Sequence, residues 1–205
     1  MVERPAHYLT TDVRIDKIVV GPFENNAFVL RCRNTGEAVL VDAANEHELL
    51  IPLSRSLGVR RVLTTHGHWD HVQAVVAARE AGIDVGIAAG DADMIDSYDF
   101  VIDDDDVIEV GALRLRTIHN PGHTPGSTSF QLVGHPVLFT GDTLFPGGPG
   151  NTNAHERASF DTIIESIDRR LFTLAPETLV MPGHGLDTTI ATERPHLDEW
   201  IARGW

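Results

Sequence analysis

Short apolar runs rich in Val, Ile and Leu alternate with segments of helical spacing along the whole chain. Apolar runs bounded by turn residues predict β-strands, and Asn34–Gly36 and Gly111 mark two of the turns. The predicted strands are Ile15–Val20, Ala27–Cys32, Ala38–Val41, Arg61–Thr64, Val85–Ala88, Val107–Val110, Leu113–Ile118, Ser127–Val133, Val137–Thr140 and Thr178–Met181.

Helical spacing fills several of the intervals between these strands. Asn45 followed by Glu48 is typical of a helix start, although Pro52 leaves open a start near that proline. Apolar residues also recur at helical spacing in three later segments. These predict helices over Asp70–Ala81, from Ser159 as N-cap through Leu171, and from Pro195 through Ile201.

The order of these elements indicates the fold class. Strands first pair as hairpins and then alternate with helices, and this pattern occurs twice. Such an order favours β-sheets covered by helices in a layered α/β fold. With no linker or low-complexity segment in its 205 residues, the chain is expected to form one domain over 1–205.

The composition of the chain limits the kinds of partner that we expect. The net charge of −14 repels phosphate backbones and anionic membranes, so we expect neither nucleic acid nor a membrane as partner. No N-terminal signal pattern and no long apolar stretch is present, which predicts a cytoplasmic location. The ordinary apolar and charged fractions are typical of a globular protein, and they leave the oligomeric state open.

Three features are interpreted as structural rather than functional. Cys32 alternates with Phe28 and Leu30 on one strand face, which predicts a buried small side chain rather than a catalytic thiol. The acidic run Asp103–Asp106 lacks the other ligand spacings of a calcium loop, so a solvated turn is expected. Five scattered histidines are expected at the surface: His7, His47, His135, His155 and His196.

Metal-ligand residues are concentrated in the segment that follows the strand Arg61–Thr64. Its sequence is Thr64-Thr65-His66-Gly67-His68-Trp69-Asp70-His71. Residues two apart in an extended segment point the same way, so His66 and His68 can bind one metal ion. Asp70 and His71 lie where the chain turns into the next helix and can face a second ion.

Three further ligand-type residues each follow an apolar strand, in turns rich in glycine or proline. They are His123 in Pro121–Ser127, Asp142 in Gly141–Thr143 and His184 in Pro182–Gly185. Projecting from strand ends, they can meet the first cluster in one cleft. Together the residues provide seven nitrogen or oxygen ligands, enough for two metal ions with positions left open for water.

The ligand order resembles the metallo-β-lactamase-fold hydrolases from Asp42 to His184. The resemblance implies a four-layer αββα sandwich. It places His66, His68 and His123 on the first metal, Asp70, His71 and His184 on the second, and Asp142 between them. Asp42 matches the buried acidic position near the site, with a turn-forming aspartate as the alternative. Imidazole and carboxylate ligands suit two divalent ions, zinc first and iron or manganese as alternatives.

Finer motifs are similar to glyoxalase II, which hydrolyses hydroxyacyl-glutathione thioesters. The bridging Asp142 argues against a true β-lactamase, and Pro121–Ser127 and Gly141–Phe145 match the glyoxalase pattern. Two departures weaken glutathione as the thiol. Gly148–Asn151 lacks the cation that glyoxalase II carries there, and only 21 residues follow His184, too few for the C-terminal domain that completes the thiol site. Arg157 could replace the cation or be a solvated surface residue.

The resemblance therefore implies a metal-dependent hydrolase that cleaves a small acyl thioester with metal-activated water, Asp70 and Asp142 being the catalytic carboxylates. Trp69, Phe145 and Asn151 are expected to line the substrate pocket, with packing against the neighbouring helix as the alternative for Trp69, and His119 is expected to support the ligands. Three alternatives stay open. They are a persulfide dioxygenase with a single iron, a lactone or other ester hydrolase of the same fold, and a non-catalytic metal-binding module.

Overall fold

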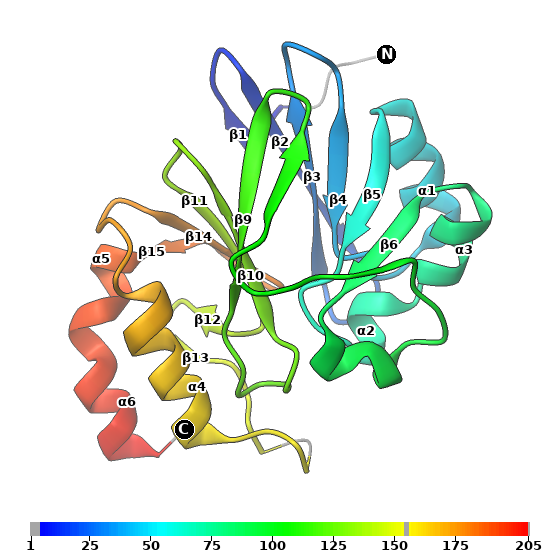
Figure 1. Ribbon diagram of the computed structural model, residues 1–205. Coiled ribbons are helices and arrows are strands. Elements are labelled where there is room, and N and C mark those ends of the chain that lie inside the picture. Colours follow the sequence, from blue (N-terminus) through cyan, green and yellow to red (C-terminus); the bar gives the residue numbers. More distant parts are fainter. Residues whose placement is uncertain (1–4, 154–155, 205) are drawn as a thin grey trace.

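Two mixed β-sheets face each other, and helices cover both outer faces (Figure 1). The computed structural model describes residues 5–153 and 156–204. Apolar side chains from both sheets, such as Phe28, Leu30, Phe130 and Phe139, form the core between them. This is the four-layer αββα sandwich that the resemblance implied, and the fold prediction is confirmed.

The first sheet has seven strands in sequence order. β1 to β4 are antiparallel neighbours, and β4 to β7 are parallel. The strands are β1 (Tyr8–Leu9), β2 (Val13–Val20), β3 (Asn25–Cys32), β4 (Ala38–Val41), β5 (Val59–Leu63), β6 (Asp84–Ile87) and β7 (Phe100–Val101).

The second sheet has the order β15-β14-β11-β10-β9-β8, and it too combines antiparallel neighbours with a parallel pair. β8 to β11 are antiparallel neighbours, and β11 then pairs in parallel with β14. Its strands are β8 (Val107–Val110), β9 (Leu113–His119), β10 (Thr128–Leu132), β11 (Val137–Gly141), β14 (Leu179–Pro182) and β15 (Thr188–Thr189), while β12 (Leu144–Phe145) and β13 (Gly148–Pro149) form a separate pair.

The helices pack on the outer faces. α1 (His47–Ser56) and α3 (Val75–Glu80) bury apolar residues against the first sheet, and α4 (Phe160–Ser166) and α6 (Leu197–Arg203) against the second. The shorter pieces are α2 (Trp69–Val72), α5 (Ile190–Glu193), 3₁₀ helices at Ala89–Met94 and Arg194–His196, and a π-helical turn at Ile167–Leu171. None of the helices in the described ranges is long and apolar enough to span a membrane.

Two helix predictions are wrong in detail. Asn45 does not cap α1, because Glu46 precedes the helix in a left-handed conformation and the Asn45 side chain accepts a bond from its backbone N–H. The helix then runs through Pro52, so the alternative start near that proline also fails. The helix predicted over 70–81 is interrupted at 73–74, where Gln73 and Ala74 donate backbone bonds to Ala44 and Ala43.

Other local predictions are confirmed. Ser159 caps α4 by accepting a bond from the backbone of Thr162. Cys32 is fully buried, and Asp103–Asp106 forms a turn at the surface. His7, His47 and His196 are exposed and His135 is partly buried, whereas His155 lies outside the described residues. Pro195 lies in the 3₁₀ turn Arg194–His196, which leads into α6.

Candidate metal centre

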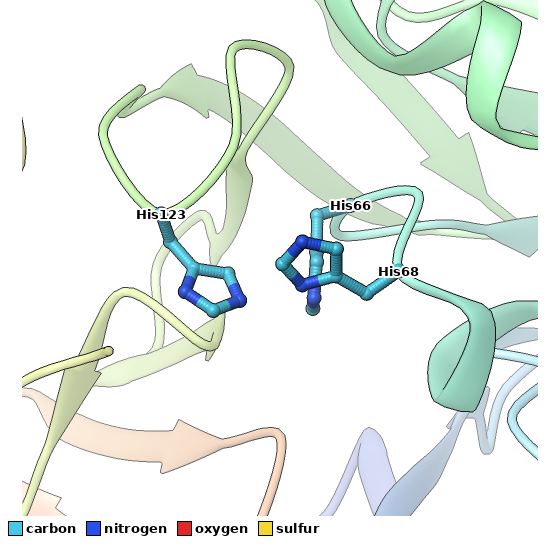
Figure 2. Close-up of side chains that lie close together, drawn as sticks. All are labelled: His66, His68 and His123. Carbon is cyan, nitrogen blue, oxygen red and sulfur yellow. The ribbon is translucent and has the colours of Figure 1, made fainter. Parts of the chain in front are cut away.

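The ligand-type residues follow the ends of β5, β9, β11 and β14. His66 and His68 lie after β5, and His123 lies in the loop after β9. Figure 2 shows the three rings converging from these two loops. One nitrogen from each ring lies within 4.8 Å of the other two, and all three residues are buried. The proposed first ligand group is therefore assembled in space.

Asp70, His71 and His184 form a second group whose ligand atoms also lie within 4.8 Å of one another. Asp70 and His71 are in α2, while His184 follows β14. His184 Nε2 is 3.3 Å from an Asp70 oxygen and 3.2 Å from His71 Nε2. Segments separated by more than 100 residues thus supply one cluster, which the strand order made possible.

Asp142, directly after β11, lies between the groups. Its carboxylate oxygens are 3.4 Å from His71 Nε2, 3.5 Å from His184 Nε2 and 3.7 Å from His123 Nε2. It also forms a third ligand-type group with His66 and His71. The carboxylate of Asp142 therefore faces residues of both groups.

The rings of the ligand-type histidines are oriented by contacts at Nδ1, as His66, His71, His123 and His184 show. Nδ1 lies 3.0 Å from Thr65 Oγ1 for His66 and 2.9 Å from Asp42 Oδ2 for His71. For His123 and His184 it lies 2.7 Å from the Asn151 carbonyl and 2.8 Å from the Phe23 carbonyl. An oxygen at Nδ1 fixes the tautomer and directs Nε2 toward the centre, as is usual for metal-binding histidines.

Asp42 connects both groups. Its side chain accepts bonds from the Thr65 backbone (2.7 Å), the Thr65 hydroxyl (2.8 Å) and His71 Nδ1. Because the Thr65 hydroxyl donates to Asp42, its oxygen is free to accept from His66 Nδ1. Asp42 is 1 % exposed with a positive φ of 60°, so its carboxylate makes these contacts as a buried group.

The two groups differ electrostatically. Burial and the neighbouring imidazoles hold the pKa of His66 well below its ordinary value. Burial would also lower the pKa of His71, but Asp142 and Asp42 raise it well above that value. The pKa of His184 is raised as well, because Asp70 and Asp142 outweigh the effect of burial.

The pKa values of the two carboxylates shift downward, in the direction opposite to those of His71 and His184. Burial would raise the pKa of Asp70, yet His184, His71 and Asn25 hold it far below the ordinary range. The pKa of Asp142 is also lowered despite burial, by His71, His123 and His184. Both side chains are therefore carboxylates at neutral pH, as metal binding requires.

The residues fit divalent metal ions. His66 Nε2 is buried and has no hydrogen-bond partner among the described residues, although such atoms are normally satisfied. It belongs to two of the ligand-type groups and is oriented toward them by Thr65. A donor set of imidazole nitrogens and carboxylate oxygens suits borderline first-row metals.

The predicted pocket residues have varied surroundings. Trp69 is 56 % exposed and makes an edge-to-face contact with the ring of Phe23, the ring centroids lying 5.3 Å apart. Phe145 is half-buried in β12. Asn151 is exposed and contacts His123 through its backbone carbonyl. The ring of His119 hydrogen-bonds to the Ile102 carbonyl rather than to a residue of the centre.

Sequence reasoning missed several residues that contact the ligands directly. Asn25 donates to Asp70 Oδ2 at 2.9 Å, Thr65 orients His66, and the Phe23 carbonyl orients His184. Asn25 and Phe23 lie 45 residues or more before the ligands that they contact. No local pattern reports such contacts, although the adjacency of Thr65 to His66 was a usable signal.

An αββα sandwich with a histidine and aspartate centre of this kind defines a class of metal-dependent hydrolases. The chain belongs to the metallo-β-lactamase superfamily, whose family profile matches residues 20–184. The match contains all seven residues of the centre.

Relatives of known name include hydroxyacylglutathione hydrolases. The chain is 29% identical to the enzyme GloC of Haemophilus influenzae, with 89% of this chain and 95% of that protein covered. It is 34% identical to the hydroxyacylglutathione hydrolase of Cereibacter sphaeroides strain ATCC 17023 over 78% of this chain. That alignment spans only 62% of the longer Cereibacter protein.

Solved structures share the fold at 27% identity. The B3 metallo-β-lactamase BLEG-1 superposes with a TM-score of 0.81, covering 89% of this chain and 97% of that one. ETHE1 from Myxococcus xanthus superposes with a TM-score of 0.78, covering 89% of this chain and 82% of that one. TTHA1623 in a di-iron-bound form gives 0.76, with coverage of 87% and 96%.

Proposed function

We propose that this protein hydrolyses acyl thioesters at a centre of two divalent metal ions. The observation that carries the proposal is the assembly of seven ligand-type residues into two adjoining groups with Asp142 between them. The similarity to hydroxyacylglutathione hydrolases supports a thioester as the substrate class. His66, His68 and His123 would hold one ion, and Asp70, His71 and His184 the other.

A bound metal pair would lower the pKa of water from about 15.7 toward about 7, which makes hydroxide available at neutral pH. The protein's contribution is to orient the reacting groups. Asp70 is ionised and held by Asn25, so its carboxylate can accept a hydrogen bond from the attacking water and orient it. A thiolate leaves without strong acid assistance, so the reaction does not require a separate general acid.

A cavity of about 350 Å³ beside His68 and His123 suits the thiol carrier. Glu156 and Arg157 also line it, so both signs of charge are present. Arg157 pairs with Asp93 at 3.2 Å. Because that charge is already compensated, the cavity would bind an anionic carrier such as glutathione weakly. This supports a neutral or zwitterionic thiol.

Apolar side chains border the other group and suit the acyl part. Trp69 lies between His68 and Asp70, and its ring contacts that of Phe23. Both side chains are more than half exposed, and the Phe23 carbonyl contacts His184. An acyl chain resting on these rings would bury apolar surface next to the reacting carbonyl.

The decisive test compares kcat/KM for lactoyl-glutathione with the same acyl group on neutral and zwitterionic thiols. We expect the glutathione ester to be the poorer substrate, and Arg157→Ala to change the ranking little. A clear preference for glutathione that Arg157→Ala abolishes would show that Arg157 anchors the carrier. Elemental analysis should find about two metal ions per chain, and a metal-free protein with full activity would contradict the proposal.

A second reaction is worth testing because the resemblance left a persulfide dioxygenase with a single iron open, and the similar TTHA1623 structure shows that a protein of this fold can hold iron. An iron-loaded protein that consumes oxygen with a thiol persulfide would be a dioxygenase. Thioester cleavage under argon, without oxygen uptake in air, is the result we expect. Lactones, phosphodiesters and a β-lactam should be tested as substrates in the same way. Metal binding without turnover of any of these substrates would favour a non-catalytic module.

A further inference from the structure

One buried aspartate outside the predicted ligand set contacts both loops of the first group. Asp91 lies in the 3₁₀ helix Ala89–Met94 after β6 and is fully buried. Its Oδ2 accepts the Gly67 backbone N–H at 2.8 Å and the Thr124 hydroxyl at 2.6 Å. Its Oδ1 accepts the Gly126 backbone N–H at 2.7 Å.

These partners adjoin all three histidines of the first group. Gly67 stands between His66 and His68, and Thr124 follows His123. The His66 loop extends from the first sheet and the His123 loop from the second. Asp91 therefore links the two sheets beside the cluster, and its contacts constrain the separation of the ligand loops.

The packing around Asp91 leaves little room for adjustment. A Cβ at Gly67 would lie 2.6 Å from Met94 Cβ, and one at Gly126 would lie 2.7 Å from Asp91 Cγ. A Cβ at Gly90 would lie 2.8 Å from the Gly126 nitrogen. Glycine at these three positions lets the backbones approach closely. A change at Asp91 would therefore be transmitted to the ligands.

We propose that Asp91 is the positioning residue of the first ligand group, setting the distance between His123 and the pair His66 and His68. The inference rests on the metal centre of the proposed function, not on its substrate. A carboxylate can accept all three hydrogen bonds, whereas an amide has one acceptor oxygen and two N–H donors. Asp91→Asn keeps the volume and disrupts this arrangement.

The test measures metal binding rather than turnover. Purified wild type and Asp91→Asn are loaded with Co²⁺, and the affinity of each site is measured against a chelator together with the visible spectrum. We expect about a 10- to 100-fold loss of affinity at one of two sites, as is typical when a supporting residue is removed. The spectrum of that site should change, and excess metal should restore occupancy.

Asp99→Asn is a control at an aspartate that is more exposed than Asp91. Asp99 also accepts a backbone bond, from Val85 at 2.9 Å, and pairs with Arg79, but it contacts no residue of the centre among those described. Melting of the metal-free proteins measures the general loss of stability in both variants. If Asp91→Asn is destabilised like the control while both Co²⁺ affinities and the spectrum stay unchanged, Asp91 is merely structural and the proposal is wrong.

Thr124→Val is a second variant, in case Asp91→Asn does not fold. It removes one of the three donors while keeping the side-chain volume, and a smaller loss at the same site is expected. Unchanged affinity in Thr124→Val, with Asp91→Asn unfolded, would also overturn the proposal. A protein that loses one metal in Asp91→Asn yet cleaves no thioester in the wild type would sustain the positioning role and refute the proposed reaction.

Discussion

The two ligand groups differ in their exposure to water. His66 and His68 are buried and the side chain of His123 is 7% exposed, whereas the side chains of Asp70 and His184 are 18% and 24% exposed. The first group is enclosed by two loops that come from different sheets. The second has one buried member, His71, and two that reach the surface.

The pKa shifts of the histidines also differ between the enclosed and the open group. The first group contains His66, whose pKa is lowered, while the second contains two histidines with raised pKa values next to carboxylates. An enclosed, neutral imidazole site is suited to retaining a metal. An open site with ionised carboxylates is suited to orienting water and admitting the substrate. The predictions below test this division.

Removal of the shared ligand should have the largest effect. Asp142→Ala should abolish binding at both sites and lower turnover by orders of magnitude, because Asp142 lies between the groups. His68→Ala should remove the enclosed metal alone and also lower turnover by orders of magnitude. Elemental analysis, kinetics and circular dichroism check occupancy, activity and fold. Near-native rates in both variants would show that the centre is wrongly assigned.

Replacement of Asp42 should affect the open group more than the enclosed one. Asp42→Asn weakens the direct contact to His71, whereas it reaches His66 only through Thr65. We expect about a 10- to 100-fold loss of affinity at the open site. Metal titration of Asp42→Asn and Asp91→Asn side by side compares the loss of affinity at each site in the two variants. Equal losses at both sites in both variants would contradict a division of support between the two aspartates.

Acidification should release the open metal first. Metal binding requires neutral imidazole, and a raised pKa means that His71 and His184 take up protons at a higher pH. The lowered pKa of His66 keeps that ring neutral to a lower pH. Occupancy measured by dialysis across a pH series should therefore fall in two steps. A single step, or loss of the enclosed metal first, would contradict the electrostatic difference.

The smallest effect is expected for the apolar rim of the open group. Lengthening the acyl chain on one thiol should raise kcat/KM by about 2- to 4-fold per methylene that rests on the rings. Trp69→Ala and Phe23→Ala should flatten this series. Tyr98→Ala removes an exposed aromatic side chain elsewhere and should leave the slope unchanged. The ratio of long to short substrate within each variant cancels general changes in turnover.

The sequence alone was informative where chemistry and local structure coincide. His66, His68, Asp70 and His71 are close in the chain, so their spacing after a strand already indicated a metal site. Apolar periodicity located the main strands to within a few residues, because a strand with a buried face must alternate or be apolar throughout. Apolar periodicity did not predict the break between α2 and α3, because backbone hydrogen bonds to Ala43 and Ala44 determine that break.

Only the tertiary structure decided how the centre is supported. Asn25, Thr65 and Asp91 act through hydrogen bonds to residues that are mostly distant in sequence, and a single polar residue carries no periodic signal. The exposure of Trp69 and the pairing of Arg157 with Asp93 likewise depend on which loops meet at the sandwich edge. Ligand identity is thus a local property of the chain, whereas ligand orientation arises when the two sheets pack.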